Sequence, residues 1–267
     1  MPVPNAPAVN SADTALLVHH AREAGKIARK FFGGSYKSWD KSRGNPVTEA
    51  DIAIDTYLRT ALLAERPSYG WLSEETEDDS SRLTRARIFV VDPIDGTHGF
   101  IRGRPHFTIA AGVVENGRPV AAAIYNPITE EMYEASPQSG ARLNGAVIHV
   151  SSQDSVAHAT ILAPRDIGTY PQWRGRFPDS TKLENRASIA YRLGLVAEGR
   201  FDAVISLSAK HDWDLAAGDL ILHEAGGRVT SQTGALLTYN HPKPLQHGVV
   251  CAGPKLHQAI LELLDPS

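Results

Sequence analysis

An uncharged run of β-branched and aromatic residues, IFVV at 88–91, is followed directly by Asp92 and then by Asp95. A run of this kind predicts a strand that is buried on both faces. With 267 residues the chain can bury a large core, either as one large α/β domain or as two closely packed domains. We therefore expect an α/β protein in which both aspartates stand at the carboxyl end of a buried strand, where open α/β sheets place their ligand sites.

Helical patterns precede residue 69 and strand patterns follow it. The first ten residues contain three prolines and predict a loose tail, after which Ser11 is a candidate N-cap of a first helix. Thr48 is a candidate N-cap of a second helix, and the polar segment between the two helices predicts a loop. Short apolar runs separated by turns fill residues 69–150, and the link ENGRP within them is a strong hairpin signal.

Strand and helix patterns alternate beyond residue 150, which is typical of an α/β unit. We expect residues 1–150 to form an α+β unit, in which two helices pack on a largely antiparallel sheet. Residues 151–267 are expected to form the α/β unit. The site would then lie between the two units, with Asp214 supplied by the second.

The charge balance argues against several classes of partner. Charged residues make up 21% of the chain and the formal net charge is −3, so no basic surface is expected to recruit a nucleic acid polymer or an anionic membrane. No run of about 18 apolar residues is present, and the N-terminus lacks the pattern of a secretion signal. The single cysteine, Cys251, rules out an intrachain disulfide and suits a reducing cytosol. We expect a cytoplasmic protein.

Asp92 and Asp95 are close enough in sequence to share a cation. Two carboxylates at one strand end repel each other and lose hydration, so one must take up a proton or both must bind a positive ion. The fixed φ of Pro93 predicts a turn in which the backbone carbonyl of Ile94 points to the same side as the two carboxylates. These oxygen ligands suit Mg²⁺, Mn²⁺ or Ca²⁺, and the absence of a nearby histidine or cysteine pair argues against zinc.

The segment GTHGF, residues 96–100, has the features of an anion site. Gly96 allows a close approach, Thr97 offers a hydroxyl group, and a helix beginning here would present several backbone N–H groups. Next to a divalent cation, this arrangement suggests phosphate. The simpler interpretation, which these residues alone leave open, is a turn with a capping aspartate.

Acids elsewhere in the chain bear on this choice. Glu74 follows another apolar run and could reach the same strand end, whereas Glu75 is expected to face water. The acids at 77–79 predict a solvated loop. Asp214 begins a strongly helical segment that the glycines at 226–227 end. An aspartate at a helix N-terminus is usually only a cap, so Asp214 taken alone does not indicate a site.

Taken together, four segments resemble the inositol monophosphatase superfamily of metal-dependent, lithium-sensitive phosphatases. They are SEE (73–75), DPIDGT (92–97), WDLAAG (213–218) and EAGG (224–227), in this order along the chain. The resemblance runs from the first helix to the last. It implies a layered α-β-α-β-α sandwich of the inositol monophosphatase and sugar phosphatase type, and an enzyme that hydrolyses phosphate monoesters.

The resemblance also implies the metal ligands. A first metal ion would be bound by Glu74, Asp92, the carbonyl of Ile94 and Asp95. A second would be bound by Asp92, Asp95 and Asp214. The cofactor would be Mg²⁺, as two or three ions, with Mn²⁺ as an alternative. The chemistry is in-line attack of an activated water on phosphorus, because such ions lower the pKa of bound water.

Roles in catalysis and in substrate binding follow from the same resemblance. Thr97 and Asp51 would orient and deprotonate the attacking water, and Glu74 would take part in catalysis as well. Asp51 also fits the capping box of its own helix, and the two roles are compatible. The substrate contacts would come from Asp95, Gly96, Thr97, Lys210 and Asp214.

The identity of the phosphate ester depends on a departure from the family pattern. Inositol monophosphatases carry a glutamate seven residues before the last metal aspartate, where this chain has Leu207. Lys210, Arg102 and Arg104 add cations that suit a ligand with a second phosphate, although a solvated basic rim is the simpler interpretation. The chain is in this respect most similar to bacterial 3'(2'),5'-bisphosphate nucleotidases, which act on adenosine 3',5'-bisphosphate.

Three alternatives stay open. The enzyme could be an inositol-1-monophosphatase or a histidinol-phosphate phosphatase, or the chain could be a catalytically silent binding protein with the same fold. All the ligand positions are filled by competent residue types, which favours catalysis. The expected partner is a small phosphorylated substrate, and the resemblance adds a homodimer as one option.

Overall fold

The computed structural model describes residues 6–42, 44–164, 166–171, 173 and 177–264. Among them, the α-helices are α1 Ala6–Phe31, α2 Glu49–Glu65, α3 Thr97–Ile101, α4 Ile189–Ala197, α5 Asp212–Glu224 and α6 Pro254–Leu261. Short 3₁₀ helices occupy Ser81–Thr84 and Ile167–Thr169.

The strands form a large sheet, a smaller sheet and two separate two-stranded pairs. The large sheet contains β3 Gly70–Ser73, β4 Arg87–Asp95, β5 Thr108–Glu115, β6 Arg118–Asn126, β7 Glu131–Ala135, β8 Ala141–Leu143 and β9 Ala146–Ile148, in this order. The smaller sheet has the order β11 Lys182–Glu184, β10 Thr160–Leu162, β12 Ala203–Ser206, β16 Val249–Ala252 and β14 Arg228–Thr230. The pairs are β1 Ser38–Ser42 with β2 Asn45–Thr48, and β13 Lys210–His211 with β15 Leu245–Gln246.

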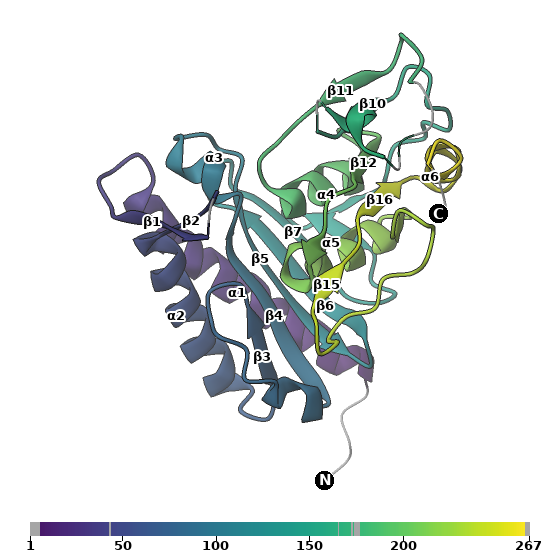
Figure 1. The fold of residues 1–267 in the computed structure, drawn as a ribbon. Helices are drawn as coiled ribbons and strands as arrows, with labels where there is room; N and C mark the ends of the chain where they lie inside the picture. Colours follow the sequence, from purple (N-terminus) through teal and green to yellow (C-terminus); the bar gives the residue numbers. More distant parts are fainter. Residues whose placement is uncertain (1–5, 43, 165, 172, 174–176, 265–267) are drawn as a thin grey trace.

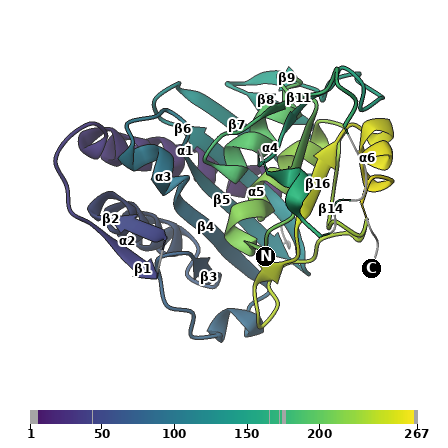
Figure 2. The same cartoon turned by 45° about the horizontal axis from the view of Figure 1, so that its top comes forward.

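Helices and sheets alternate in five layers (Figure 1). Helices α1 and α2 cover one face of the large sheet, and α4 and α5 lie between its other face and the smaller sheet. Helix α6 covers the outer face of the smaller sheet, as the turned view also shows (Figure 2). This order confirms the expected α-β-α-β-α sandwich. In the large sheet only β3 and β4 pair in parallel.

Strand β4 is buried along its whole length, as the uncharged run at 88–91 predicts for its central part. Phe89 and Val91 pack in the core beneath α1 and α2, whereas Ile88 and Val90 pack in the core beneath α4 and α5. Side chains alternate between the two faces of a strand, so a strand between two helical layers is buried on both faces, which favours an unbroken apolar run such as 88–91. The strand therefore carries Asp92 and Asp95 into the centre of the molecule.

Local sequence signals correctly predict the start of α2 and the turn between β5 and β6. Thr48 caps α2, and the carboxylate of Asp51 accepts from the backbone N–H of Thr48 over 2.9 Å, which completes a capping box. Strands β5 and β6 are joined through Asn116 and Gly117, whose φ angles are 51° and 75°. Two successive residues with positive φ form the tight hairpin turn that the Asn-Gly pair predicts.

The N-terminal tail and the polar loop are predicted wrongly. Residues 6–10 belong to α1, so Ser11 is not its N-cap, while residues 1–5 lie outside the described residues. Proline is tolerated in a first helical turn, and Pro7 stands there. Arg87 of β4 also binds the start of α1, donating to Asn10 and to Asp13 over 3.0 Å each.

The predicted loop between α1 and α2 contains the pair β1–β2. All five residues of β1 are exposed, so no apolar alternation marks it as a strand. None of the described helices is both long and apolar enough to cross a membrane. The expected division into units at residue 150 stays a prediction.

Candidate active site

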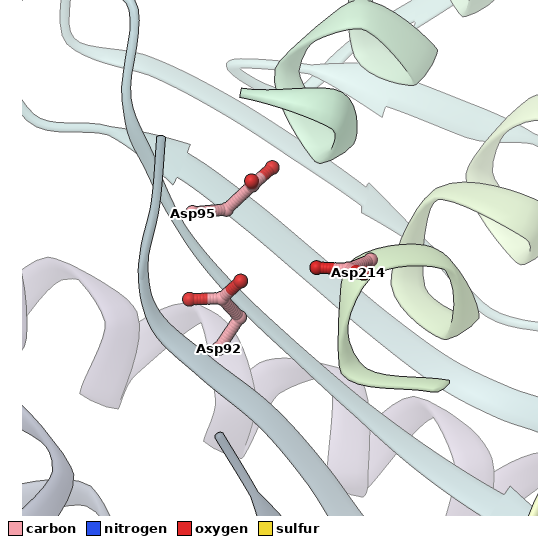
Figure 3. Close-up of side chains that lie close together, drawn as sticks. All are labelled: Asp92, Asp95 and Asp214. Carbon is pink, nitrogen blue, oxygen red and sulfur yellow. The ribbon is translucent and has the colours of Figure 1, made fainter. Parts of the chain in front are cut away.

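Three carboxylates converge where β4 ends against the first turn of α5. Ligand oxygens of Asp92, Asp95 and Asp214 all lie within 4.8 Å of one another. Figure 3 shows the three side chains close together, two from β4 and one from α5. Acids that are 122 and 119 positions apart in sequence therefore meet, as the four motifs predict.

The bend at Pro93 is a β-bulge and not the predicted turn. Asp92 pairs with Ala110 and Asp95 pairs with Thr108, so β4 has one more residue than β5 between these two pairs. In a regular strand, side chains three positions apart point to opposite faces. The extra residue cancels this alternation, which allows Asp92 and Asp95 to face the same cavity. The two carboxylates converge as predicted, but a bulge within the strand brings them together, and the role of the Ile94 carbonyl stays a prediction.

The three carboxylates differ in how many donors they have. Oδ2 of Asp95 accepts from Ser188 Oγ over 2.6 Å and from the backbone N–H of Ala190 over 2.5 Å. Oδ2 of Asp214 accepts from the backbone N–H of His211 over 2.7 Å, so this aspartate also has its predicted capping role. Oδ1 of Asp92 is buried and has no hydrogen-bond partner among the described residues.

Burial disfavours the charged forms of all three acids, and repulsion by other carboxylates adds to this for Asp92 and Asp214. Burial, followed by the charges of Glu74 and Asp95, raises the pKa of Asp92 well above its ordinary value. Burial raises the pKa of Asp95 to about 6 even though its hydrogen bonds oppose the shift. Burial and the charge of Asp95 raise the pKa of Asp214 to about 8. An unpartnered buried oxygen within such a cluster fits a divalent cation with hard oxygen ligands.

Thr97 connects this cluster to Asp51. Its Oγ1 lies 3.1 Å from the carbonyl oxygen of Ile94 and 3.3 Å from Oδ1 of Asp51. The other carboxylate oxygen of Asp51 is held by Thr48, whose Oγ1 donates over 2.5 Å. Burial raises the pKa of Asp51 to about 6. The structure thus brings together the two residues that were predicted to act on water.

Gly96 precedes α3, which begins at Thr97 as predicted. Its φ is 93°, and a Cβ atom on it would lie 2.8 Å from the carbonyl oxygen of His106 and 2.9 Å from the backbone nitrogen of Ser188. A side chain therefore cannot be accommodated there. The close approach that requires glycine is made by the protein's own backbone. Gly96 also lines the cavity that the aspartates face, and its contact with a substrate stays a prediction.

Glu74 lines the same cavity but is not part of the three-aspartate cluster. Lys41 of β1 donates from Nζ to the carboxylates of both Glu74 and Glu75, over 2.8 Å each. The side chain of Glu75 is only 3% exposed, so the prediction that it faces water is wrong. Residues 77–79 are exposed, as predicted. The contact with Lys41 could not be predicted, because β1 carries no strand pattern.

The three aspartates line a cavity of about 410 Å³, here called the acidic cavity. Ser206, Ser208 and Lys210 also line it, and Nζ of Lys210 donates to Ser208 Oγ over 2.8 Å. Leu207 is buried in the apolar core beneath α6. The position at which the sequence pattern expects a glutamate is therefore apolar, and hydroxyl groups and an amine stand on this wall instead.

A second cavity, of about 650 Å³, adjoins the acidic cavity. Arg102 and Arg104 line this second cavity and not the acidic one, so the structure separates them from Lys210. His98, Ala187 and Arg192 border both. Sequence reasoning did not identify Arg192, or the role of Ser188 as a partner of Asp95. The N-cap serine of α4 has a local signal, but its bond to a residue 93 positions away has none.

Comparisons with known proteins agree with this geometry. A family model described as the inositol monophosphatase family matches residues 10–267. The inositol-1-monophosphatase of Rhizobium meliloti (strain 1021) is 32% identical over 262 residues, covering 94% of this chain and 95% of that protein. The Nus factor SuhB of Xylella fastidiosa (strain Temecula1 / ATCC 700964) is 32% identical over 242 residues, covering 86% of this chain and 83% of that protein.

A solved structure shows the same fold. The crystal structure of the extragenic suppressor protein suhB from Bartonella henselae aligns with a TM-score of 0.82 and 27% sequence identity. The alignment covers 94% of this chain and 98% of that chain.

Proposed function

Because the chain belongs to the inositol monophosphatase family of metal-dependent phosphatases, we propose that it uses Mg²⁺ to hydrolyse phosphate monoesters in the acidic cavity. One observation carries this proposal. Three aspartates converge within 4.8 Å, and a buried oxygen of Asp92 has no partner among the described residues. Such a cluster is costly for a protein unless a cation binds to it.

The proposed ligands are the oxygens that face this cavity. Asp92, Asp95 and Asp214 would form the centre of the site, with Glu74 and the carbonyl of Ile94 beside them. Two or three Mg²⁺ ions are proposed, and Mn²⁺ suits the same oxygen ligands. Bound divalent cations would supply positive charge that polarises the phosphoryl group and makes water more acidic. Lys41 binds Oε1 of Glu74, which leaves the other carboxylate oxygen of Glu74 as the atom that would join them.

Asp51 and Thr97 are proposed to remove a proton from the attacking water. Oγ1 of Thr97 would accept this proton while its own proton passes to Oδ1 of Asp51, 3.3 Å away. Thr48 holds the other oxygen of Asp51, which fixes the direction of the receiving atom. A pKa raised to about 6 suits a carboxylate that must gain and lose a proton near neutral pH.

The best candidate substrate is adenosine 3',5'-bisphosphate, as for a 3'(2'),5'-bisphosphate nucleotidase. Lys210 and the hydroxyl groups of Ser206 and Ser208 support this choice, because they favour an anionic substrate on the cavity wall. Leu207 offers no acceptor for the hydroxyl groups of an inositol ring. Inositol 1-phosphate is the second candidate, since the Rhizobium relative is named an inositol-1-monophosphatase.

A phosphate-release screen tests the proposal directly. The purified protein is assayed with Mg²⁺ against adenosine 3',5'-bisphosphate, inositol 1-phosphate, histidinol phosphate and fructose 1,6-bisphosphate, with and without a chelator. We expect chelator-sensitive release that is fastest from adenosine 3',5'-bisphosphate. Faster release from inositol 1-phosphate or histidinol phosphate would replace the substrate but keep the phosphatase. No release from any ester would favour a silent binding protein.

A further inference from the structure

The second cavity carries more positive charge than Arg102 and Arg104, the two lining arginines identified from the sequence, would give it. Four arginines line it, together with two histidines and one glutamate, and we call it the arginine cavity. The arginines are Arg102, Arg104, Arg186 and Arg192. Helix α3 and the segment after it form one side, and β11, the loop after it and α4 form the other. The backbone N–H of Ser188 donates to the carbonyl of His106 over 3.2 Å and joins the two sides.

Arg192 is the most unusual of these arginines, because it is buried and its hydrogen bonds go to uncharged oxygens. It is only 9% exposed, and its guanidinium donates to the carbonyl of Arg186 and to Oδ1 of Asn185, both over 2.7 Å. No carboxylate forms an ion pair with it among the described residues. The charge of Asp95 in the acidic cavity acts on Arg192 but forms no ion pair with it, so an anion that binds directly beside the guanidinium is favoured.

The other three arginines are more accessible. Arg186 pairs with Glu184 over 2.9 Å and lies 5.2 Å from the centre of the Phe201 ring. Arg102 and Arg104 are exposed and form no ion pair among the residues that the structure describes. Burial, followed by the charges of Arg186 and Arg104, lowers the pKa of His106. The cavity is therefore a region of positive potential.

The two cavities are neighbours with opposite charge. Arg192, His98 and Ala187 border both, so a substrate whose reacting phosphate lies among the aspartates can extend into the arginine cavity. A volume of about 650 Å³ is within the range of small-molecule sites. Planar guanidinium groups suit phosphate, because each donates through two parallel N–H groups.

We propose that the arginine cavity binds a second phosphate group of the substrate, and that Arg104, Arg186 and Arg192 make the enzyme selective for bisphosphorylated esters. This inference rests on the proposed phosphatase function and deepens it. The second phosphate group, which does not react, would then lie in the arginine cavity on the far side of Arg192. Lys210 lines only the acidic cavity and would not contact it.

The test compares two esters that differ only in the second phosphate. The kcat/KM of the Mg²⁺-loaded enzyme is measured for adenosine 3',5'-bisphosphate and for adenosine 3'-monophosphate, in wild type, Arg104→Gln and Arg186→Gln. We expect wild type to prefer the bisphosphate, and each variant to lower the ratio of the two kcat/KM values by about tenfold, mainly through KM. Arg59→Gln on α2 is the matched control, because Arg59 is exposed and lines neither cavity.

Arg104 is the safer position for this test, since it is exposed and its replacement leaves no buried group unpaired. A ratio that stays at the wild-type value in both Arg104→Gln and Arg186→Gln would overturn the inference. A wild-type ratio near one would overturn it as well. If wild type released no phosphate from either ester, the proposed function itself would fail, so the two failures can be told apart.

Discussion

The acidic cavity and the arginine cavity share a border, but they are built from different kinds of structure. Asp92 and Asp95 stand on the bulged end of β4, and Asp214 stands in the first turn of α5, so regular elements hold short side chains in fixed positions. Arg102 and Arg104 extend from the end of α3 and the segment after it, on long and exposed side chains. Fixed carboxylates suit the chemical step, which needs metal ligands at exact positions. Long arginine side chains suit binding of a second phosphate group, whose position can vary from one substrate to another.

The largest effect is expected in the acidic cavity. Asp95→Asn should lower kcat by at least about a thousandfold, because it removes a charge that helps to hold cations worth several kcal/mol of transition-state stabilisation. Asparagine can still accept from Ser188 or Ala190, so the circular dichroism spectrum should not change. Asp154→Asn is the control, since Asp154 is exposed and pairs only with Lys255 over 3.7 Å. An unaltered kcat in Asp95→Asn would exclude Asp95 from the site.

The next largest effect concerns Thr97. Thr97→Val keeps the shape of the side chain but removes the hydroxyl that links water to Asp51, so kcat should fall by about a hundredfold with little change in KM. Thr233→Val, at an exposed position outside both cavities, is the matched control. A Thr97→Val enzyme with wild-type kcat would show that this hydroxyl takes no part in proton transfer.

Magnesium should stabilise the fold, through the acidic cavity alone. At about one hundred times its Kd, a ligand of the native state adds about 2.7 kcal/mol, which corresponds to roughly 5 to 10 °C in Tm for a chain of this size. Asp214→Asn should lose most of this shift, whereas Arg104→Gln should keep it. Thermal unfolding with and without Mg²⁺ measures both. An equal shift in wild type and Asp214→Asn would contradict the assignment of the cluster as a metal site.

The same carboxylates predict how the stability of the metal-free protein depends on pH. The pKa values of Asp95 and Asp214 are raised to about 6 and about 8, so the folded state keeps protons that the unfolded state has already lost. Stability contributed by these groups should therefore be fully present below about pH 4 and should be lost as the pH rises to about 8. Urea unfolding in a chelator at several pH values tests this, and Asp214→Asn should show a shallower decline.

The smallest expected effect is a difference between the two cavities in how strongly salt weakens substrate binding. Exposed arginines are screened by ions, whereas buried carboxylates are screened much less. Raising KCl from about 0.05 to about 0.5 M should increase KM for adenosine 3',5'-bisphosphate several-fold and leave kcat nearly unchanged. The KM for adenosine 3'-monophosphate should rise less. Equal salt dependence for the two esters would remove the distinction between the cavities.

Much of the fold can be predicted from local patterns, because the forces that set them act over a few residues. The uncharged run before Asp92 predicts a strand that is buried on both faces, and Thr48 with Asp51 predicts the start of a helix. Only the family motifs predict the convergence of Asp92, Asp95 and Asp214, since no local pattern indicates that β4 ends against α5.

Long-range packing could not be predicted in the same way. The bulge at Pro93 depends on the register with β5, and the start of α1 depends on its contacts with Arg87. The pair β1–β2 is fully exposed along β1, so Lys41 gave no sign of its contact with Glu74. Only the folded chain brings the arginines that follow α3 next to those of the loop after β11 and of α4.

A crystal of the protein soaked in Mn²⁺ tests the central claim most directly, because the anomalous signal of manganese locates the ion without reference to activity. We expect strong anomalous density between the carboxylates of Asp92, Asp95 and Asp214, next to the unpartnered oxygen of Asp92. A fully soaked crystal with no such density there, or with Asp214 turned to solvent, would contradict a metal-dependent phosphatase site in this cavity.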